Sequence, residues 1–165
     1  MESDNTFDKL STLLRQHNEH KTLIPRLIYL SHYLLFHHVN FATLIVVGNL
    51  AILGLYVGFL KQLGNNRFIQ PIAVMLAFTL FQAQTIQSMF WAMAAVSNYY
   101  VLFFAMLSLA ILTHKKTYQH LVLAGAVGLL ATFTQANGML VFGAGAVYLF
   151  QNLLLERKKT QIGNN

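Results

Sequence analysis

Three long uncharged blocks limit what this chain can fold into. They run from Leu27 to Leu60, from Phe68 to His114 and from Thr117 to Leu155, and short clusters of Lys and Arg separate them. Each block is longer than the roughly 20 apolar residues that carry a helix across a bilayer core about 30 Å thick. The sequence therefore predicts an all-α, polytopic membrane protein that lies in a lipid bilayer.

The composition argues against a soluble protein. Charged residues make up 10% of the chain and apolar residues 56%, whereas about a quarter of the residues in a soluble domain are charged. The net charge is +6, but seven of the eleven Lys and Arg residues lie directly beside apolar blocks. Membrane topology explains this charge better than nucleic-acid binding, so we expect no nucleic-acid partner. Cysteine is absent, which excludes disulfides, thiolate catalysis and Cys-based metal sites.

The chain divides into a polar segment, an interfacial helix and a bundle of about five membrane spans. The polar segment covers 1–22, the N-terminal interfacial helix is expected over 23–40, and the bundle over 41–155. The stretch 117–155 can hold two short spans, or one span and a re-entrant segment, because exposed backbone at membrane depth is tolerated where protein or a wet cavity covers it. We expect transmembrane helices over 41–60, 68–86, 98–113, 119–133 and 139–155.

Basic residues alternate between the loops. Lys and Arg follow the first, third and fifth expected spans, whereas the turns 87–97 and 134–138 contain neither. Cytoplasmic loops carry an excess of Lys and Arg. The pattern therefore predicts an inner-membrane protein with the basic tail, 156–165, in the cytoplasm and the N-terminal segment outside. Because such a polar segment is not easily exported without a preceding span, we expect the chain to be a fragment.

Reactive side chains are densest at Asn18, Glu19, His20 and Lys21. The predicted orientation places them at the outer face, beside the bilayer. Surroundings of low dielectric disfavour a charged carboxylate, which suits Glu19 to accept a proton as a general base. The spacing alone favours the alternative, a solvated loop without chemistry.

A metal site near His17, Glu19 and His20 is disfavoured by spacing. Metalloprotease helices place two His four positions apart, with a Glu beside one of them. His17 and His20 are one position closer than that. We interpret His37 and His38 as interfacial residues at the end of a helix.

Arg26 follows Pro25 at the border of the apolar region. Its guanidinium can fork onto a phosphate or carboxylate, or extend toward lipid headgroups, and both interpretations stay open. Amides inside the spans must find partners, because an unpaired amide in hydrocarbon is costly. We expect most of them to bond helix to helix and a minority to line a substrate groove: Gln82, Gln84, Gln87, Asn98, Gln135 and Asn137.

The run NEHKTLIPRLIYLSHYLLF, residues 18–36, resembles a segment of bacterial polytopic proteins related to the glycosyltransferase C superfamily. In those proteins it follows the first transmembrane helix. The runs 88–112 and 129–150 are also similar, the second through its Ala-Asn-Gly pattern. The resemblance covers roughly residues 15 to 155. Lys21 stands where the family usually has Arg, and the family's spans before this segment and after the Ala-Asn-Gly pattern are not in this chain.

The resemblance implies transfer of a sugar from a polyprenyl-phosphate carrier at the outer face of the membrane. By position, Glu19 is the catalytic base or helps to hold a divalent metal ion, with His20 beside it. Lys21, Arg26 and Asn137 are the expected substrate-binding residues, and Arg26 is the candidate for the carrier phosphate. The metal ligands and any other cofactor stay unassigned.

The alternative is a non-enzymatic multi-pass membrane subunit or remnant without a catalytic site. Its polar residues would only hold helices together. A transporter is disfavoured because no Asp, Glu, Lys or Arg falls inside an expected span, whereas transport pathways commonly carry an ionisable residue at mid-membrane.

Overall fold

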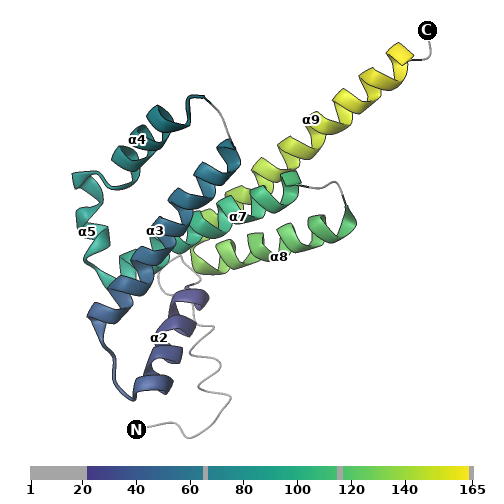
Figure 1. Ribbon diagram of the computed structural model, residues 1–165. Coiled ribbons are helices and arrows are strands. Elements are labelled where there is room, and N and C mark those ends of the chain that lie inside the picture. Colours follow the sequence, from purple (N-terminus) through teal and green to yellow (C-terminus); the bar gives the residue numbers. More distant parts are fainter. Residues whose placement is uncertain (1–21, 65–66, 115–116, 164–165) are drawn as a thin grey trace, which may run out of the picture.

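The computed structural model describes residues 22–64, 67–114 and 117–163 (Figure 1). Within these ranges every regular element is helical and no strand forms, so the predicted all-α class is confirmed. The elements are α2 (Leu23–Phe36), α3 (Phe41–Leu63), α4 (Ile69–Leu80), η1 (Ala83–Thr85), α5 (Ile86–Met89), α6 (Ala92–Ala94), η2 (Ala95–Tyr99), α7 (Tyr100–His114), α8 (Tyr118–Thr134), η3 (Ala136–Met139) and α9 (Leu140–Gly163).

The first helix of the described residues, α2, ends at Phe36 rather than at residue 40. His37 adopts a left-handed conformation with a φ of 56°, and its N–H donates to the Tyr33 carbonyl. Asn40 then begins α3, because its side-chain oxygen accepts hydrogen bonds from the N–H groups of Ala42 and Thr43 at 3.0 and 3.3 Å. This N-cap satisfies backbone donors that a helix start leaves unpaired. His37 and His38 therefore lie at a helix end, as the sequence indicated.

In the described part of the chain, three continuous helical stretches are long and apolar enough to cross a membrane: Phe41–Leu63, Ala92–His114 and Ala136–Arg157. The second of these joins α6, η2 and α7 and begins earlier than the expected span 98–113. The reason is that η2 is a five-residue π-helix, which continues the helical path from Ala92 into α7. The expected turn before residue 98 is therefore partly helical.

The expected span 68–86 is not one continuous helix. The helix α4 has 12 residues and is about 18 Å long at the usual rise per residue. It ends at Leu80 with Phe81 as its C-cap, and Gln82 is extended, with a ψ of 159°. The hydroxyl and N–H of Thr85 donate to the Gln82 carbonyl at 2.8 and 3.0 Å, so local turn bonds replace those of the helix.

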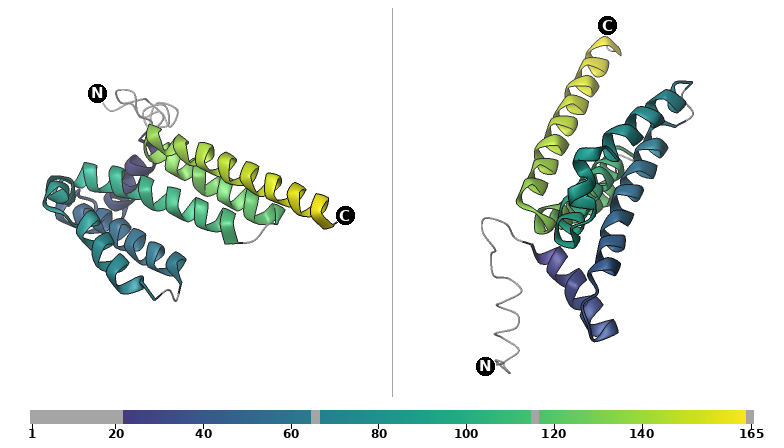
Figure 2. Two further views of the ribbon diagram at one scale, coloured as in Figure 1. Left: turned by 90° about the horizontal axis from the view of Figure 1, so that it is seen from above. Right: turned by 90° about the vertical axis from the view of Figure 1, so that its left-hand side faces the viewer.

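Successive long elements run in alternating directions. In Figures 1 and 2, α4 returns along α3, α8 returns along α7, and α9 leads away again from the end of α8. The C-terminal ends of α3, α7 and α9 thus point toward one end of the molecule. Two groups result, α3 with α4 and α7 with α8 and α9, and they meet at η2.

The contact of α3 with η2 forms the buried centre of the bundle. Its core residues are Ala51, Ile52, Ala95 and Tyr99. Gly48 is buried in the same contact, and a Cβ atom at this position would lie 2.6 Å from the Ala95 Cβ. Small residues of this kind allow helix backbones to approach closely in membranes.

Hydrogen bonds from side chains to backbone carbonyls also join the helices. Asn49 donates to Met89 at 2.9 Å, Tyr100 to Val47 at 3.2 Å, Tyr56 to Ala73 at 3.4 Å and Ser108 to Ala124 at 2.7 Å. Asn49 lies in the first expected span, where the sequence marks it as suited to close helix packing, and none of the four donors is among the six amides named for bonds between helices. Asn98 and Gln135 are half-buried, and Gln82, Gln87 and Asn137 are exposed.

We predict that Gly48→Ala destabilises the protein by about 1–3 kcal/mol, because the added methyl forces the α3 and η2 backbones apart. Gly125→Ala in α8 is the matched control, since a Cβ atom there has nothing within 4 Å. Both changes gain the same helix propensity. The measurement is the midpoint of denaturant unfolding of the purified protein in detergent, followed by circular dichroism. Equal midpoints for the two variants would contradict the close contact.

Candidate functional site

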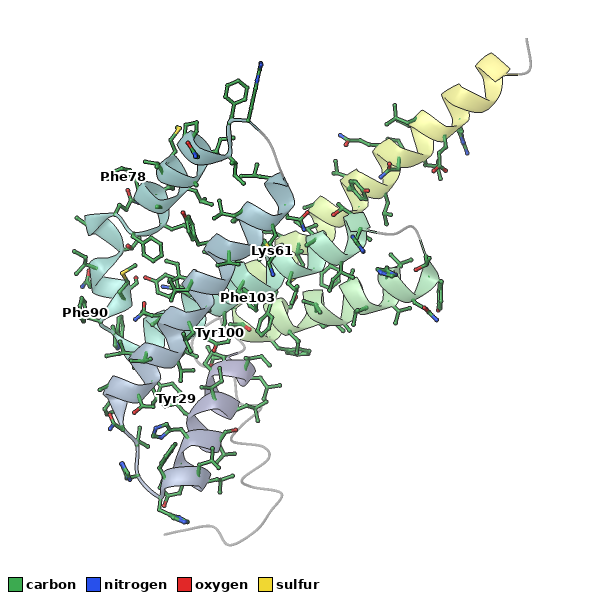
Figure 3. All side chains as sticks on the ribbon, in the orientation of Figure 1. Tyr29, Lys61, Phe78, Phe90, Tyr100 and Phe103 are labelled. Atoms are coloured by element: carbon green, nitrogen blue, oxygen red, sulfur yellow. The ribbon has the colours of Figure 1, made fainter. Side chains whose placement is uncertain are left out.

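A cavity of about 610 Å³ lies between α2, the start of α3 and the segment that opens α6. Its walls come from segments that are distant in the sequence and meet because α2 packs against η2 and α8. Figure 3 shows Tyr29 on α2 beside the lower part of α3. The lining residues are Thr22, Pro25, Arg26, Tyr29, Phe41, Trp91, Ala92 and Met93.

The cavity combines one cation with walls that are mostly apolar and aromatic. Among the described residues, Arg26 is the only charged one that lines the cavity, and it is half-buried. Pro25 fits the first turn of α2, where its missing N–H costs no helical bond, and the Arg26 N–H donates to the Thr22 carbonyl at 3.1 Å. The helix start therefore holds Arg26 at the cavity wall.

Two hydroxyl groups add hydrogen-bonding capacity. Thr22 and Tyr29 both line the cavity. Burial raises the pKa of the Tyr29 phenol, so its hydroxyl stays protonated at neutral pH and is able to donate a hydrogen bond. One guanidinium and two hydroxyls beside aromatic walls suit an elongated apolar molecule with an anionic head.

Of the expected site residues, Arg26 lines this cavity. Glu19, His20 and Lys21 lie outside the described residues, and they directly precede Thr22 in the sequence. Their roles stay predictions. Asn137 is exposed in η3 and does not line the cavity. Its role in substrate binding also stays a prediction.

The Ala-Asn-Gly stretch has a structural explanation of its own. Gln135 is extended and ends α8, and its N–H donates to the Ala131 carbonyl at 3.1 Å. Gly138 is buried, and a Cβ atom there would overlap the same carbonyl. The glycine thus lets the chain fold closely over the end of α8 before α9 begins.

The described residues contain no group of three or more His, Cys, Asp or Glu side chains placed to hold a metal ion. His32 is buried, and its ring centre lies 6.4 Å from that of His38. The Nδ1 atom of His38 lies 2.7 Å from the Phe36 carbonyl oxygen. The other residues considered for a metal, His17, Glu19 and His20, lie outside the described ranges.

Several lining residues were not identified from the sequence. The sequence pattern did not single out Phe41, Trp91 or Met93 as candidate site residues. Each of these side chains is ordinary in a membrane sequence. Only the packing of distant segments brings them to Arg26, and the hydropathy of a single sequence contains no record of such contacts.

Comparisons of the chain with protein-family models, with curated proteins and with solved structures give no significant match. The relation to the glycosyltransferase C superfamily therefore rests on the residue patterns described above. It is carried forward as a proposal.

We predict that the cavity binds farnesyl phosphate more tightly than farnesol, because only the phosphate engages Arg26. Trp91 is the single tryptophan of the chain and lines the cavity, so its fluorescence reports occupancy in nanodiscs. Arg26→Gln should weaken phosphate binding roughly 10- to 100-fold, as expected for loss of a charge-assisted hydrogen bond. Arg157→Gln, at the other end of the molecule, is the control. Equal affinity for the two ligands would contradict this assignment.

Proposed function

We propose that this chain is an integral membrane protein of the glycosyltransferase C type, which binds a polyprenyl-phosphate sugar in the cavity and transfers the sugar at the outer face of the membrane. One observation carries the proposal. Arg26 lies in an apolar and aromatic cavity whose first lining residue, Thr22, directly follows Glu19, His20 and Lys21.

The proposed roles follow from the chemistry of the side chains. Arg26 forks onto the carrier phosphate, and the hydroxyls of Thr22 and Tyr29 donate to the same group. Phe41 and Trp91 pack against the isoprenoid chain. These contacts would hold the donor by its phosphate and its isoprenoid chain.

In the proposed reaction, Glu19 takes the proton from a hydroxyl of the acceptor, and His20 lies next to it in sequence. The acceptor oxygen attacks the anomeric carbon, and the bond from that carbon to the phosphate oxygen breaks. The carrier phosphate leaves with the bonding electrons, and Arg26 stabilises the negative charge that develops on it. A divalent ion held with the help of Glu19 is the other role that the resemblance implies for this residue.

The distribution of charge supports a definite orientation. The cavity is lined by Phe41 and Ala92, which begin two of the long helical stretches. Lys61 lies in the last turn of the first of these stretches, and Lys115 and Lys116 follow the second in sequence. Since Lys and Arg favour the cytoplasmic side, the cavity faces outward in an inner membrane crossed about five times.

Labelling tests this orientation, and the absence of cysteine from the chain makes it direct. Single Asn18→Cys and Lys116→Cys variants are treated in intact cells with a membrane-impermeant maleimide. We expect labelling at position 18 and none at position 116. The reverse pattern would place Glu19 on the wrong side for a donor at the outer face.

We predict that Glu19→Gln lowers the rate of sugar transfer roughly 100-fold or more, the usual contribution of a general base. Membrane vesicles with the complete protein are supplied with a radiolabelled polyprenyl-phosphate sugar, and release of the label from the lipid fraction is measured. Glu156→Gln makes the same chemical change in α9, far along the chain from the cavity, and should leave the rate unchanged.

An unchanged rate in the Glu19 variant, with the donor still bound, would refute the catalytic assignment. The chain would then be better described as a non-enzymatic membrane subunit.

A further inference from the structure

The break between α4 and α5, residues Phe81–Thr85, lies at the depth of the middle of α3. The rings of Tyr56 and Phe81 are 6.2 Å apart, and Asn49 donates to the Met89 carbonyl at 2.9 Å. At the usual rise per residue, Tyr56 and Asn49 each lie about 10 Å inside their end of α3. When α3 crosses the membrane, the break is therefore within the hydrocarbon layer.

On the inner side of this break, backbone carbonyls accept hydrogen bonds from side chains of the same chain. The Thr85 hydroxyl donates to the carbonyls of Leu80 and Gln82, and the Tyr99 hydroxyl donates to the Thr85 carbonyl at 3.3 Å. Its outer side differs, because Gln82 and Gln87 are exposed. An amide that faces lipid without a partner is costly, and non-helical backbone at membrane depth needs cover by protein or by water.

The surroundings of the two glutamines favour protein over water. Large apolar side chains flank them: Phe78 is 76% exposed, Ile86 50% and Phe90 74%. Figure 3 shows Phe78 and Phe90 at the outer edge of the molecule, away from α9. Neither glutamine lines the cavity at Arg26 or the two smaller cavities beside α8 and α9. A polar centre with an apolar rim is typical of helix association in membranes, where glutamine bonds across helices.

We propose that this face, defined by Phe78, Gln82, Ile86, Gln87 and Phe90, is the interface between two copies of the chain. A carboxamide both donates and accepts hydrogen bonds. The side chain of a glutamine in one copy can therefore bond to the side chain of the same glutamine in the other copy across a twofold axis. The face also meets its own copy without repulsion, because Phe68 to His114 contains no Asp, Glu, Lys or Arg. A charged partner would find no opposite charge on this face with which to form an ion pair.

Cross-linking in native membranes tests the interface. Gln87→Cys supplies the only thiol, and copper phenanthroline accepts the two electrons when two thiols join as a disulfide. We expect a covalent dimer from Gln87→Cys and none from Val147→Cys, which lies on α9 and is 58% exposed. Equal cross-linking of both variants would show random collision and overturn the proposal. Labelling of Gln87→Cys by a water-soluble maleimide, without cross-linking, would also overturn it and indicate a wet vestibule.

A second measurement does not depend on a reactive residue. Gln82→Leu combined with Gln87→Leu should raise the dimer dissociation constant in detergent roughly tenfold, the usual strength of such bonds in membranes, as followed by light scattering. Gln119→Leu, an exposed glutamine of α8, is the matched control. An unchanged constant would refute the role of the glutamines. Because both experiments measure association, their result is separate from that for sugar transfer.

Discussion

The close approach of α3 to η2 is the contact on which the rest of the structure depends. Gly48 lies directly against Ala95, so the two long helical stretches cross at backbone distance. In a membrane the hydrophobic effect does not drive helices together, and close packing of small residues takes over that role. The π-helical turn of η2 widens the second helix at this crossing, where Ala95, Val96, Ser97 and Tyr99 are all buried.

This crossing also positions the cavity. It sets the start of α3 beside the start of α6, and α2 closes the remaining side with Arg26. The cavity thereby lies at one end of the molecule. The C-terminal ends of α3 and α7 lie toward the opposite end, and basic residues follow them in the sequence. The alternating direction of the helices thus separates the cavity from the basic residues that follow α3 and α7.

The sequence predicted which stretches form helices better than it predicted the residues at which those helices begin and end. Uncharged length predicted α3, α7 and α9, and an interfacial helix was expected over 23–40, where α2 spans Leu23–Phe36. The ends of α2 and α4 were missed, because the Asn40 cap and the Thr85 turn bonds are local contacts that hydropathy does not show. The candidate site was found in part: Arg26 stood out as a charge beside apolar residues, whereas Phe41 and Trp91 join it only through packing.

What the sequence determined by itself was the helical class, the membrane environment and the alternation of basic and neutral loops, because each depends on composition along a stretch of chain. The tertiary structure decided which residues meet. It placed Asn49, Tyr100 and Ser108 against backbone carbonyls of other helices, and it left Gln82 and Gln87 on an outer face. The physical reason is that a polar side chain in hydrocarbon must find a partner, and the geometry of packing determines whether that partner lies within the same chain.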